Sequence, residues 1–169
     1  MRRTIQLLIA AVAVQALLAV AGAPAQARET ALSNYEPGTI VVKTSERKLY
    51  LVLGNGETRA YPVGVGKAGR SWTGRRLINA KYINPDWSPP AIIRRERPGI
   101  PDVIAGGTPN NPMGVAAMTL SGSQYAIHGT NNQSSIGHFV SYGCIRMHNR
   151  DIMDLFERVS VGTPVVVLH

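Results

Sequence analysis

Cysteine is almost absent from this chain, which has a single one, Cys144, among 169 residues. One thiol cannot form an internal disulfide. In an exported protein, where the surroundings are oxidising, a lone cysteine forms an intermolecular bridge, is buried and inert, or is reactive. The stretch around Cys144 is rich in glycine and polar residues, whereas a packed core cysteine usually has apolar neighbours. This context favours a reactive thiol.

Acidic residues are scarce as well, with 10 Asp and Glu against 18 Lys and Arg, for a net charge of +8. A basic protein suits a polyanionic surface, an acidic polymer or an anionic membrane face. The sequence has no basic stripe with interleaved aromatic residues, so we expect no nucleic acid partner. Internal repeats and low-complexity tracts are also missing.

The one long apolar run lies at the start of the chain, from Ile5 to Ala23. Two arginines precede it and the small-residue site Ala25-Gln26-Ala27 follows it, which is the pattern of a cleaved secretory signal. No basic cluster follows to stop transfer, so we predict cleavage rather than a membrane anchor.

The expected mature chain, residues 28–169, is long enough for one well-packed domain. The removed segment holds two arginines and no acid, so the mature net charge would be +6. Residues 28–37 are a short polar lead-in, and residues 38–168 would form the domain. We expect no stable membrane span after cleavage.

Short segments rich in β-branched and aromatic residues dominate the mature chain and predict strands. Turn residues separate the first three of them, which predicts an antiparallel meander rather than a βαβ unit. The predicted strands are Thr39–Lys43, Lys48–Leu53, Thr58–Val65, Leu77–Ile83, Met113–Leu120, Gln124–His128 and Val165–Leu168.

A single helix is predicted, over Asn149–Val159, with Asn149 as its N-cap. Apolar residues at positions i, i+3, i+4 and i+7 form a stripe that would pack on the sheet, namely Ile152, Leu155, Phe156 and Val159. Frequent prolines between Gly66 and Pro112 forbid long helices there. Within that region, Ile92–Asn111 is predicted to be a long loop that acts as a lid or a binding surface. The predicted fold is mostly β with one packed C-terminal helix.

The stretch Ile127–Met147 combines a thiol, an imidazole and a glycine next to the thiol, which are the parts of a nucleophilic site. His128 is the candidate general base, because it follows an apolar strand that would hold it rigidly. An imidazole beside the thiol of Cys144 would raise its thiolate fraction. Gly143 permits a sharp turn, so that backbone amides near the thiol can point at a developing oxyanion.

Arg146 is the next candidate. If Cys144–Arg146 is extended, the alternation of a strand puts both side chains on one face. Arg146 would then bind a substrate carboxylate, favour the thiolate, or form a surface salt bridge.

Two other chemistries fit the residues less well. The zinc-competent residues His128, His138, Cys144 and His148 are separated by 10, 6 and 4 positions, which matches no paired-ligand pattern. The glycines at positions 64, 66 and 69 fit the dinucleotide-binding pattern G-x-G-x-x-G, but they follow a meander and open no helix. We therefore expect neither a metal site nor a cofactor.

The sequence resembles the L,D-transpeptidase catalytic domain, also called the YkuD-type domain, from Gly38 to Leu168. The resemblance is carried by His128-Gly129-Thr130, Ser135-Ile136-Gly137, Ser141-Tyr142-Gly143-Cys144-Ile145-Arg146-Met147, the Asn149-x-Asp151 helix and Val161-Gly162-Thr163-Pro164-Val165-Val166-Val167. Two places differ from the usual pattern. Many members carry His where this chain has Tyr142, and their T-P-x-G segment is Ser71-Trp72-Thr73-Gly74-Arg75 here.

This resemblance implies a mixed β-sandwich and a periplasmic cysteine enzyme that acts on peptidoglycan stem peptides. Cys144 would attack the carbonyl at the L-centre of diaminopimelate in a tetrapeptide stem, D-Ala would leave, and the thioester would pass to an amine acceptor. His128 would transfer the protons, and backbone amides around Gly143 would bind the oxyanion. The implied substrate-binding residues are Gly129, Thr130, Ser141, Tyr142 and Arg146.

The acceptor stays open at this point. It would be a second diaminopimelate, an amine on an outer-membrane protein, or water. Water would make the protein an L,D-carboxypeptidase or an amidase that detaches wall-bound proteins. A non-catalytic peptidoglycan-binding module of the same fold is the remaining alternative, and the intact His128 and Cys144 argue against it.

Overall fold

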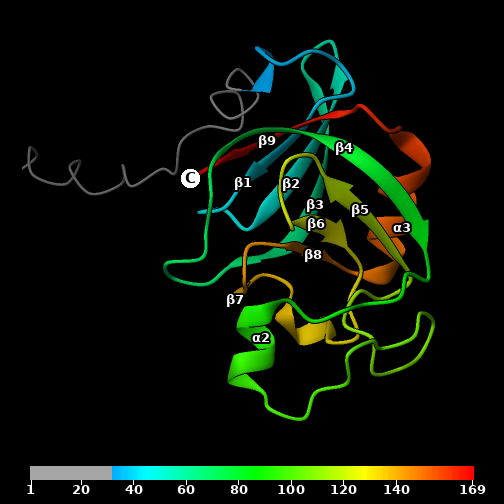
Figure 1. Cartoon of the computed structure of the whole chain (residues 1–169). Coiled ribbons are helices and arrows are strands. Elements are labelled where there is room, and N and C mark those ends of the chain that lie inside the picture. Colours follow the sequence, from blue (N-terminus) through cyan, green and yellow to red (C-terminus); the bar gives the residue numbers. More distant parts are fainter. Residues whose placement is uncertain (1–31) are drawn as a thin grey trace, which may run out of the picture.

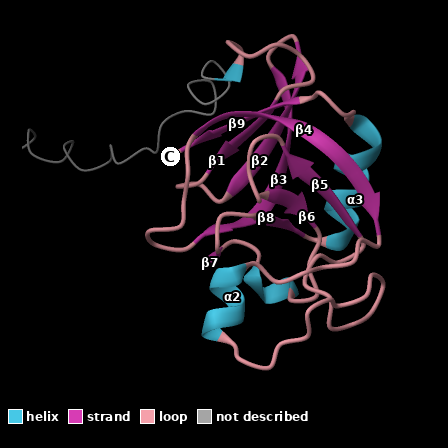
Figure 2. Cartoon of the chain, viewed as in Figure 1, coloured by secondary structure: helices cyan, strands magenta, loops and turns pink. Residues whose placement is uncertain are grey.

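The computed structural model describes residues 32–169, so the expected export signal over residues 1–27 lies outside the described residues. Strands make up most of the regular secondary structure of the described part, as predicted (Figure 2). Its helices are α2 (Ala91–Glu96) and α3 (Asn149–Arg158), with one 3-10 turn, η1 (Gln133–Ser135). Its strands are β1 (Ile40–Lys43), β2 (Lys48–Gly54), β3 (Glu57–Gly66), β4 (Gly74–Ile83), β5 (Ala116–Leu120), β6 (Ala126–His128), β7 (Phe139–Ser141), β8 (Ile145–Met147) and β9 (Pro164–Leu168).

The first three strands form the predicted antiparallel meander. β1 pairs with β2, and β2 pairs with β3. The turns between them contain left-handed residues, with Arg47 (φ 52°) in the first and Asn55 (φ 53°) in the second. Asn tolerates this conformation better than most residues, which suits the second turn to a hairpin.

The sheet closes on itself. Its strand order is β2-β1-β9-β4-β5-β6-β8-β3-β7, and β2 also pairs with β3, which joins the two sides (Figure 1). Three neighbouring pairs, β1–β9, β6–β8 and β3–β7, are parallel, and the others are antiparallel. The result is a barrel-like sandwich, which confirms the predicted mostly-β, mixed fold.

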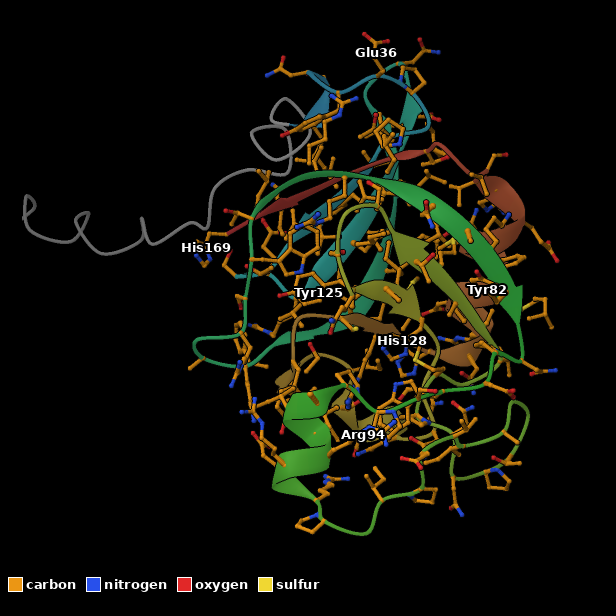
Figure 3. All side chains as sticks on the ribbon, in the orientation of Figure 1. Glu36, Tyr82, Arg94, Tyr125, His128 and His169 are labelled. Carbon is orange, nitrogen blue, oxygen red and sulfur yellow. The ribbon has the colours of Figure 1, made fainter. Side chains whose placement is uncertain are left out.

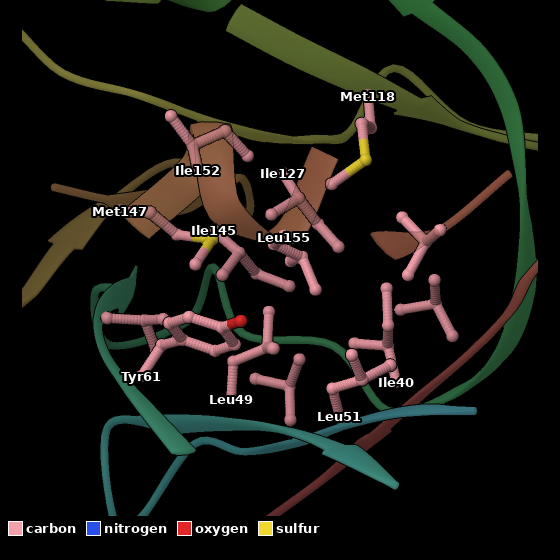
Figure 4. Packing of buried hydrophobic residues seen from close by; sticks show 14 of the residues in the cluster. Ile40, Leu49, Leu51, Tyr61, Met118, Ile127, Ile145, Met147, Ile152 and Leu155 are labelled. Atoms are coloured by element: carbon pink, nitrogen blue, oxygen red, sulfur yellow. The ribbon is translucent and has the colours of Figure 1, made fainter. Parts of the chain in front are cut away.

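The main hydrophobic core fills the inside of the closed sheet (Figure 4). Ile127 from β6 and Ile145 from β8 belong to it, and so do Ile152 and Leu155 from α3. The predicted apolar stripe of α3 is therefore confirmed. The predicted N-cap was wrong, because Asn149 is the first residue of the helix and the preceding histidine takes the cap position.

The proline-rich segment 84–112 lies at the end of the sheet where β7 and β8 run (Figure 1). The expectation of a single helix was wrong here, because α2 begins directly after Pro90, although it buries no residue. A bridge between Trp87 and Ile104 closes the segment. The buried Asn111 amide donates to three carbonyls of the same segment and holds it together.

Between Leu32 and His169 no helix is long and apolar enough to cross a bilayer.

Candidate active site

β6 and β8 lie side by side and parallel, with Ile127 opposite Ile145 and His128 opposite Arg146. Because the two isoleucines belong to the core, the alternation of a strand directs His128 and Arg146 to the other face of the sheet. Cys144 directly precedes β8 and shares this face with Arg146. Figure 3 shows His128 between the strands and the segment that carries α2. The candidate base, thiol and guanidinium therefore come together.

The imidazole of His128 is 4% exposed, and its Nδ1 lies 2.6 Å from the carbonyl oxygen of Gly129. A carbonyl oxygen only accepts, so Nδ1 carries the proton and Nε2 has a free lone pair. Burial, and then the Arg146 cation, lowers the pKa of His128 to about 4, against the opposing effect of the Gly129 and Met113 carbonyls. At neutral pH the ring is a neutral base.

Cys144 is partly exposed. Burial raises the pKa of its thiol, whereas the backbone N–H of Ala126 and the Arg146 guanidinium act in the opposite direction. The resting pair is thus a neutral thiol and a neutral imidazole rather than an ion pair. A thiol in this state needs a base before it can attack a carbonyl.

The turn before Cys144 is built by Ser141 and Gly143. The buried hydroxyl of Ser141 accepts from the N–H of Gly143 at 3.1 Å and donates to the carbonyl of Cys144 at 2.6 Å. Gly143 has a φ of 120°, and a Cβ there would overlap the ring of Tyr125, so glycine is required. Its amide, the predicted oxyanion donor, is already used by Ser141. The backbone N–H groups of Tyr142 and Cys144, in contrast, have no hydrogen-bond acceptor within residues 32–169.

Asn149 supports the chain after His128, a role that the sequence did not reveal. Its side-chain Oδ1 accepts from the N–H of Thr130 at 2.9 Å and occupies the space that a Cβ at Gly129 or Gly114 would need. Gly129 and Thr130, which we predicted to bind substrate, are buried. Together with the buried Ser141, they support the candidate catalytic residues and present no polar side chain to solvent.

Arg146 is partly buried, and its buried Nε has no hydrogen-bond partner. Burial lowers the pKa of Arg146, the Cys144 thiol acts against this, and the cation of Arg97, which follows α2, lowers the pKa further. Within residues 32–169 Arg146 forms no ion pair, so the salt-bridge alternative is not realised. A guanidinium with a free donor is suited to a carboxylate ligand.

Tyr142 connects the turn to α2. Its hydroxyl donates to the carboxylate of Glu96, and the ammonium of Lys67 lies 4.0 Å from its ring centroid. Lys67 also lies 4.0 Å from the same carboxylate. Exposed contacts of this kind contribute about 0–1 kcal/mol each. The segment over the site is therefore held weakly at this point.

The other histidines lie apart from this group. His138 and His169 are exposed, and Nδ1 of His148 lies 2.6 Å from Oε1 of Gln133. Between residues 32 and 169 no three His, Cys, Asp or Glu side chains come together so as to hold a metal ion.

Known proteins resemble this chain over most of its described length. The family model of the L,D-transpeptidase catalytic domain (YkuD) matches residues 37–167. The probable L,D-transpeptidase ErfK/SrfK of Salmonella typhimurium is 43% identical over 137 residues, which is 76% of this chain and 43% of that protein. The probable L,D-transpeptidase YbiS of Escherichia coli is 39% identical over 135 residues, 75% of this chain and 43% of that protein. The chain thus spans less than half the length of these curated relatives.

Solved structures resemble the fold. L,D-transpeptidase 3 from Mycobacterium tuberculosis aligns with a TM-score of 0.60 and 17% identity, over 78% of this chain and 60% of that one. An L,D-transpeptidase from Mycobacterium smegmatis aligns with a TM-score of 0.58 and 22% identity, over 78% and 58% of the two chains. At these identities the likeness concerns the fold alone.

Proposed function

This chain belongs to the L,D-transpeptidase catalytic domain family, and we propose that it uses Cys144 as a nucleophile to exchange an amide bond in peptidoglycan stem peptides. One observation carries the proposal. The parallel strands β6 and β8 put Cys144 and His128 on one face, with Nε2 of the imidazole unprotonated. A pure binding module has no need of this arrangement.

The first step is acylation. Nε2 of His128 takes the proton of the Cys144 thiol, and the sulfur attacks the carbonyl carbon at the L-centre of diaminopimelate. A C–S bond forms as the carbonyl π electrons move onto oxygen, which accepts hydrogen bonds from the free amides of Tyr142 and Cys144. Collapse breaks the C–N bond to D-Ala, and the imidazolium returns its proton to the departing amine. The product is a thioester on Cys144.

The second step transfers the acyl group. The acceptor amine attacks the thioester, a new C–N bond forms, and the C–S bond breaks. His128 accepts the proton of the attacking amine and passes it to the departing sulfur. The lowered pKa of His128 favours the return of the proton in both steps, because an imidazolium formed in this buried site gives up its proton readily.

Arg146 binds a carboxylate of the donor stem in this proposal. The supporting observation is its buried Nε, which has no acceptor within the described residues and lies on the same face as His128 and Cys144. A carboxylate would supply that acceptor and take part in a charge-assisted pair. The basic character of the chain is consistent with an acidic wall polymer.

The proposed acceptor is an amine, from a second diaminopimelate or from an outer-membrane protein, and the proposed location is the periplasm. Whether water competes depends on how well the segment carrying α2 covers the thioester. Intact-protein mass spectrometry with a tetrapeptide stem, with and without an added amine, separates these outcomes. We expect an acyl adduct on Cys144 with loss of D-Ala and, if diaminopimelate is the acceptor, an amide-linked dimer of two stems without any added amine. An amide with the added amine should form only when that amine is present. Hydrolysis in the presence of the amine would indicate the carboxypeptidase alternative.

The site assignment is tested with faropenem, because a solved structure of L,D-transpeptidase 3 from Mycobacterium tuberculosis holds a faropenem-derived adduct. Cys144→Ala should abolish adduct formation. His128→Ala should slow it by about 10²–10⁴, the usual contribution of general-base catalysis. The matched control His138→Ala should stay within about tenfold. A wild-type protein that forms no adduct and releases no D-Ala would refute the proposed function.

A further inference from the structure

Trp72 contacts the turn that presents Cys144, although it lies 71 residues earlier in the chain. Its indole Nε1 donates to the carbonyl oxygen of Gly143 at 2.8 Å. Its ring stacks on Tyr125, with the ring centroids 5.4 Å apart and the planes within 10°. The Tyr125 ring in turn fills the space against Gly143 that any side chain would need.

Trp72 is itself held in place from β4. The guanidinium of Arg76 lies 5.1 Å from the Trp72 ring, and its Nη1 donates to the carbonyls of Ser121 at 2.9 Å and Gly122 at 3.1 Å. Trp72 is half-buried and packs on the main core. Its position is therefore set by β4 and by the connection between β5 and β6, and not by the turn that it contacts.

The carbonyl that Trp72 binds belongs to the same peptide unit as the N–H of Cys144. A trans peptide is planar, and its C=O and N–H point in opposite directions. Fixing the Gly143 carbonyl therefore fixes the direction of the Cys144 N–H. Ser141 already uses the Gly143 amide and the Cys144 carbonyl, so Trp72 supplies the restraint that the peptide between them lacks.

We propose that Trp72 is a positioning residue that aims the Cys144 N–H at the developing oxyanion. The inference rests on the proposed acyl transfer and adds to it a side chain outside the motif that contains the nucleophile. Trp72 acts through one hydrogen bond on the donor that stabilises the tetrahedral intermediate.

Two reactions of the same thiol distinguish this role from mere packing. Acylation by faropenem passes through an oxyanion, whereas alkylation by iodoacetamide displaces iodide at a saturated carbon and forms none. A misdirected Cys144 N–H therefore slows acylation and leaves alkylation unchanged. Loss of a well-placed oxyanion donor lowers rates by about 10²–10³, which sets the upper limit for Trp72.

The experiment compares wild type and Trp72→Phe, which keeps an aromatic ring but lacks the N–H. We expect faropenem acylation, followed by intact-protein mass, to slow by about tenfold or more. Iodoacetamide alkylation at the same pH should change by less than about threefold, and its pH profile should not shift. Tyr82→Phe, an exposed aromatic residue on β4, is the matched control and should leave both rates unchanged.

Replacement of Trp72 by benzothienylalanine, in which sulfur stands in the place of the N–H, keeps the shape of the indole and serves if Trp72→Phe folds poorly. It should slow acylation in the same way. Acylation within threefold of wild type in this variant would overturn the inference and leave the proposed function standing. Equal losses in acylation and alkylation would also overturn it, because Trp72 would then act on the thiol. A wild-type protein that is alkylated but never acylated would overturn the proposed function itself.

Discussion

Lowering the pH from 7 to 5 should destabilise the folded protein by about 2 kcal/mol through His128 alone. The reason is the difference between its two pKa values, the ordinary 6.5 and about 4 in the folded protein. Between these values the unfolded chain binds one more proton than the folded protein does. The free energy of unfolding then rises with pH by up to about 1.4 kcal/mol per unit.

The sign follows from burial, which disfavours the imidazolium. The stabilisation is complete above pH 6.5 and is lost as the pH falls towards 4, with a maximum near 3.4 kcal/mol, or about 2.5 units at 1.36 kcal/mol each. Two other groups titrate outside the window from pH 7 to 5. The pKa of Asp154 is lowered to about 2, first by Arg158 and then by Tyr61. The pKa of Cys144 is raised by burial.

The assay is urea unfolding followed by tryptophan fluorescence at pH 7, 6 and 5. With a urea dependence of about 1–3 kcal/mol per molar, a loss of 2 kcal/mol moves the midpoint by roughly 1 M. His128→Asn is the control, because it keeps an N–H donor for the Gly129 carbonyl and has no titrating ring. Between pH 7 and pH 5 the wild type should lose about 2 kcal/mol more of its free energy of unfolding than His128→Asn loses. Equal slopes would mean that His128 is not buried as a neutral base.

Two further predictions concern the turn before Cys144. Gly143→Ala should destabilise the protein by about 2 kcal/mol or more and slow acylation, because the φ of Gly143 is unfavourable for alanine and the new Cβ meets Tyr125. Thermal unfolding measures the loss of stability, and faropenem labelling measures the acylation rate. A stable and fully active variant would contradict the geometry of the turn. Tyr142→Phe should change stability by less than about 1 kcal/mol but expose the segment near Glu96 to trypsin, since only the hydroxyl contact is lost. Unchanged digestion kinetics would mean that this contact does not hold the segment.

The strands other than β7 and β8, and the long helix, were predictable because their signals are local. The meander shows β-branched runs separated by turn residues, and α3 has an apolar residue at each required position. β7 carries no such signal, because it has three residues and Phe139 is 49% exposed. α2 is six residues long and buries none of them, so it has no apolar stripe to read.

The site was predictable in part for the same reason. Strand alternation places Cys144 and Arg146 on one face, and this needs no knowledge of the rest of the fold. His128 lies opposite Arg146 because β6 pairs with β8 in parallel. The alternation of side chains along a strand does not reveal which strands pair. The contacts of Asn149 and Trp72 are longer in range still. The only signal for Trp72 was that it stands where related domains usually have a different segment.

The position of Arg146 bears on how the two neutral candidate catalytic groups, Cys144 and His128, would exchange a proton. Its cation lowers the pKa of both His128 and Cys144, so it disfavours the imidazolium and favours the thiolate. Transfer of the proton from thiol to imidazole produces a thiolate and an imidazolium together. Arg146 favours the first and disfavours the second, so its two effects on the transfer oppose each other. A substrate carboxylate bound to Arg146 would weaken both at once. The guanidinium is thus better placed to select an anionic donor than to drive the proton transfer, and burial of the pair remains the main reason that it rests uncharged.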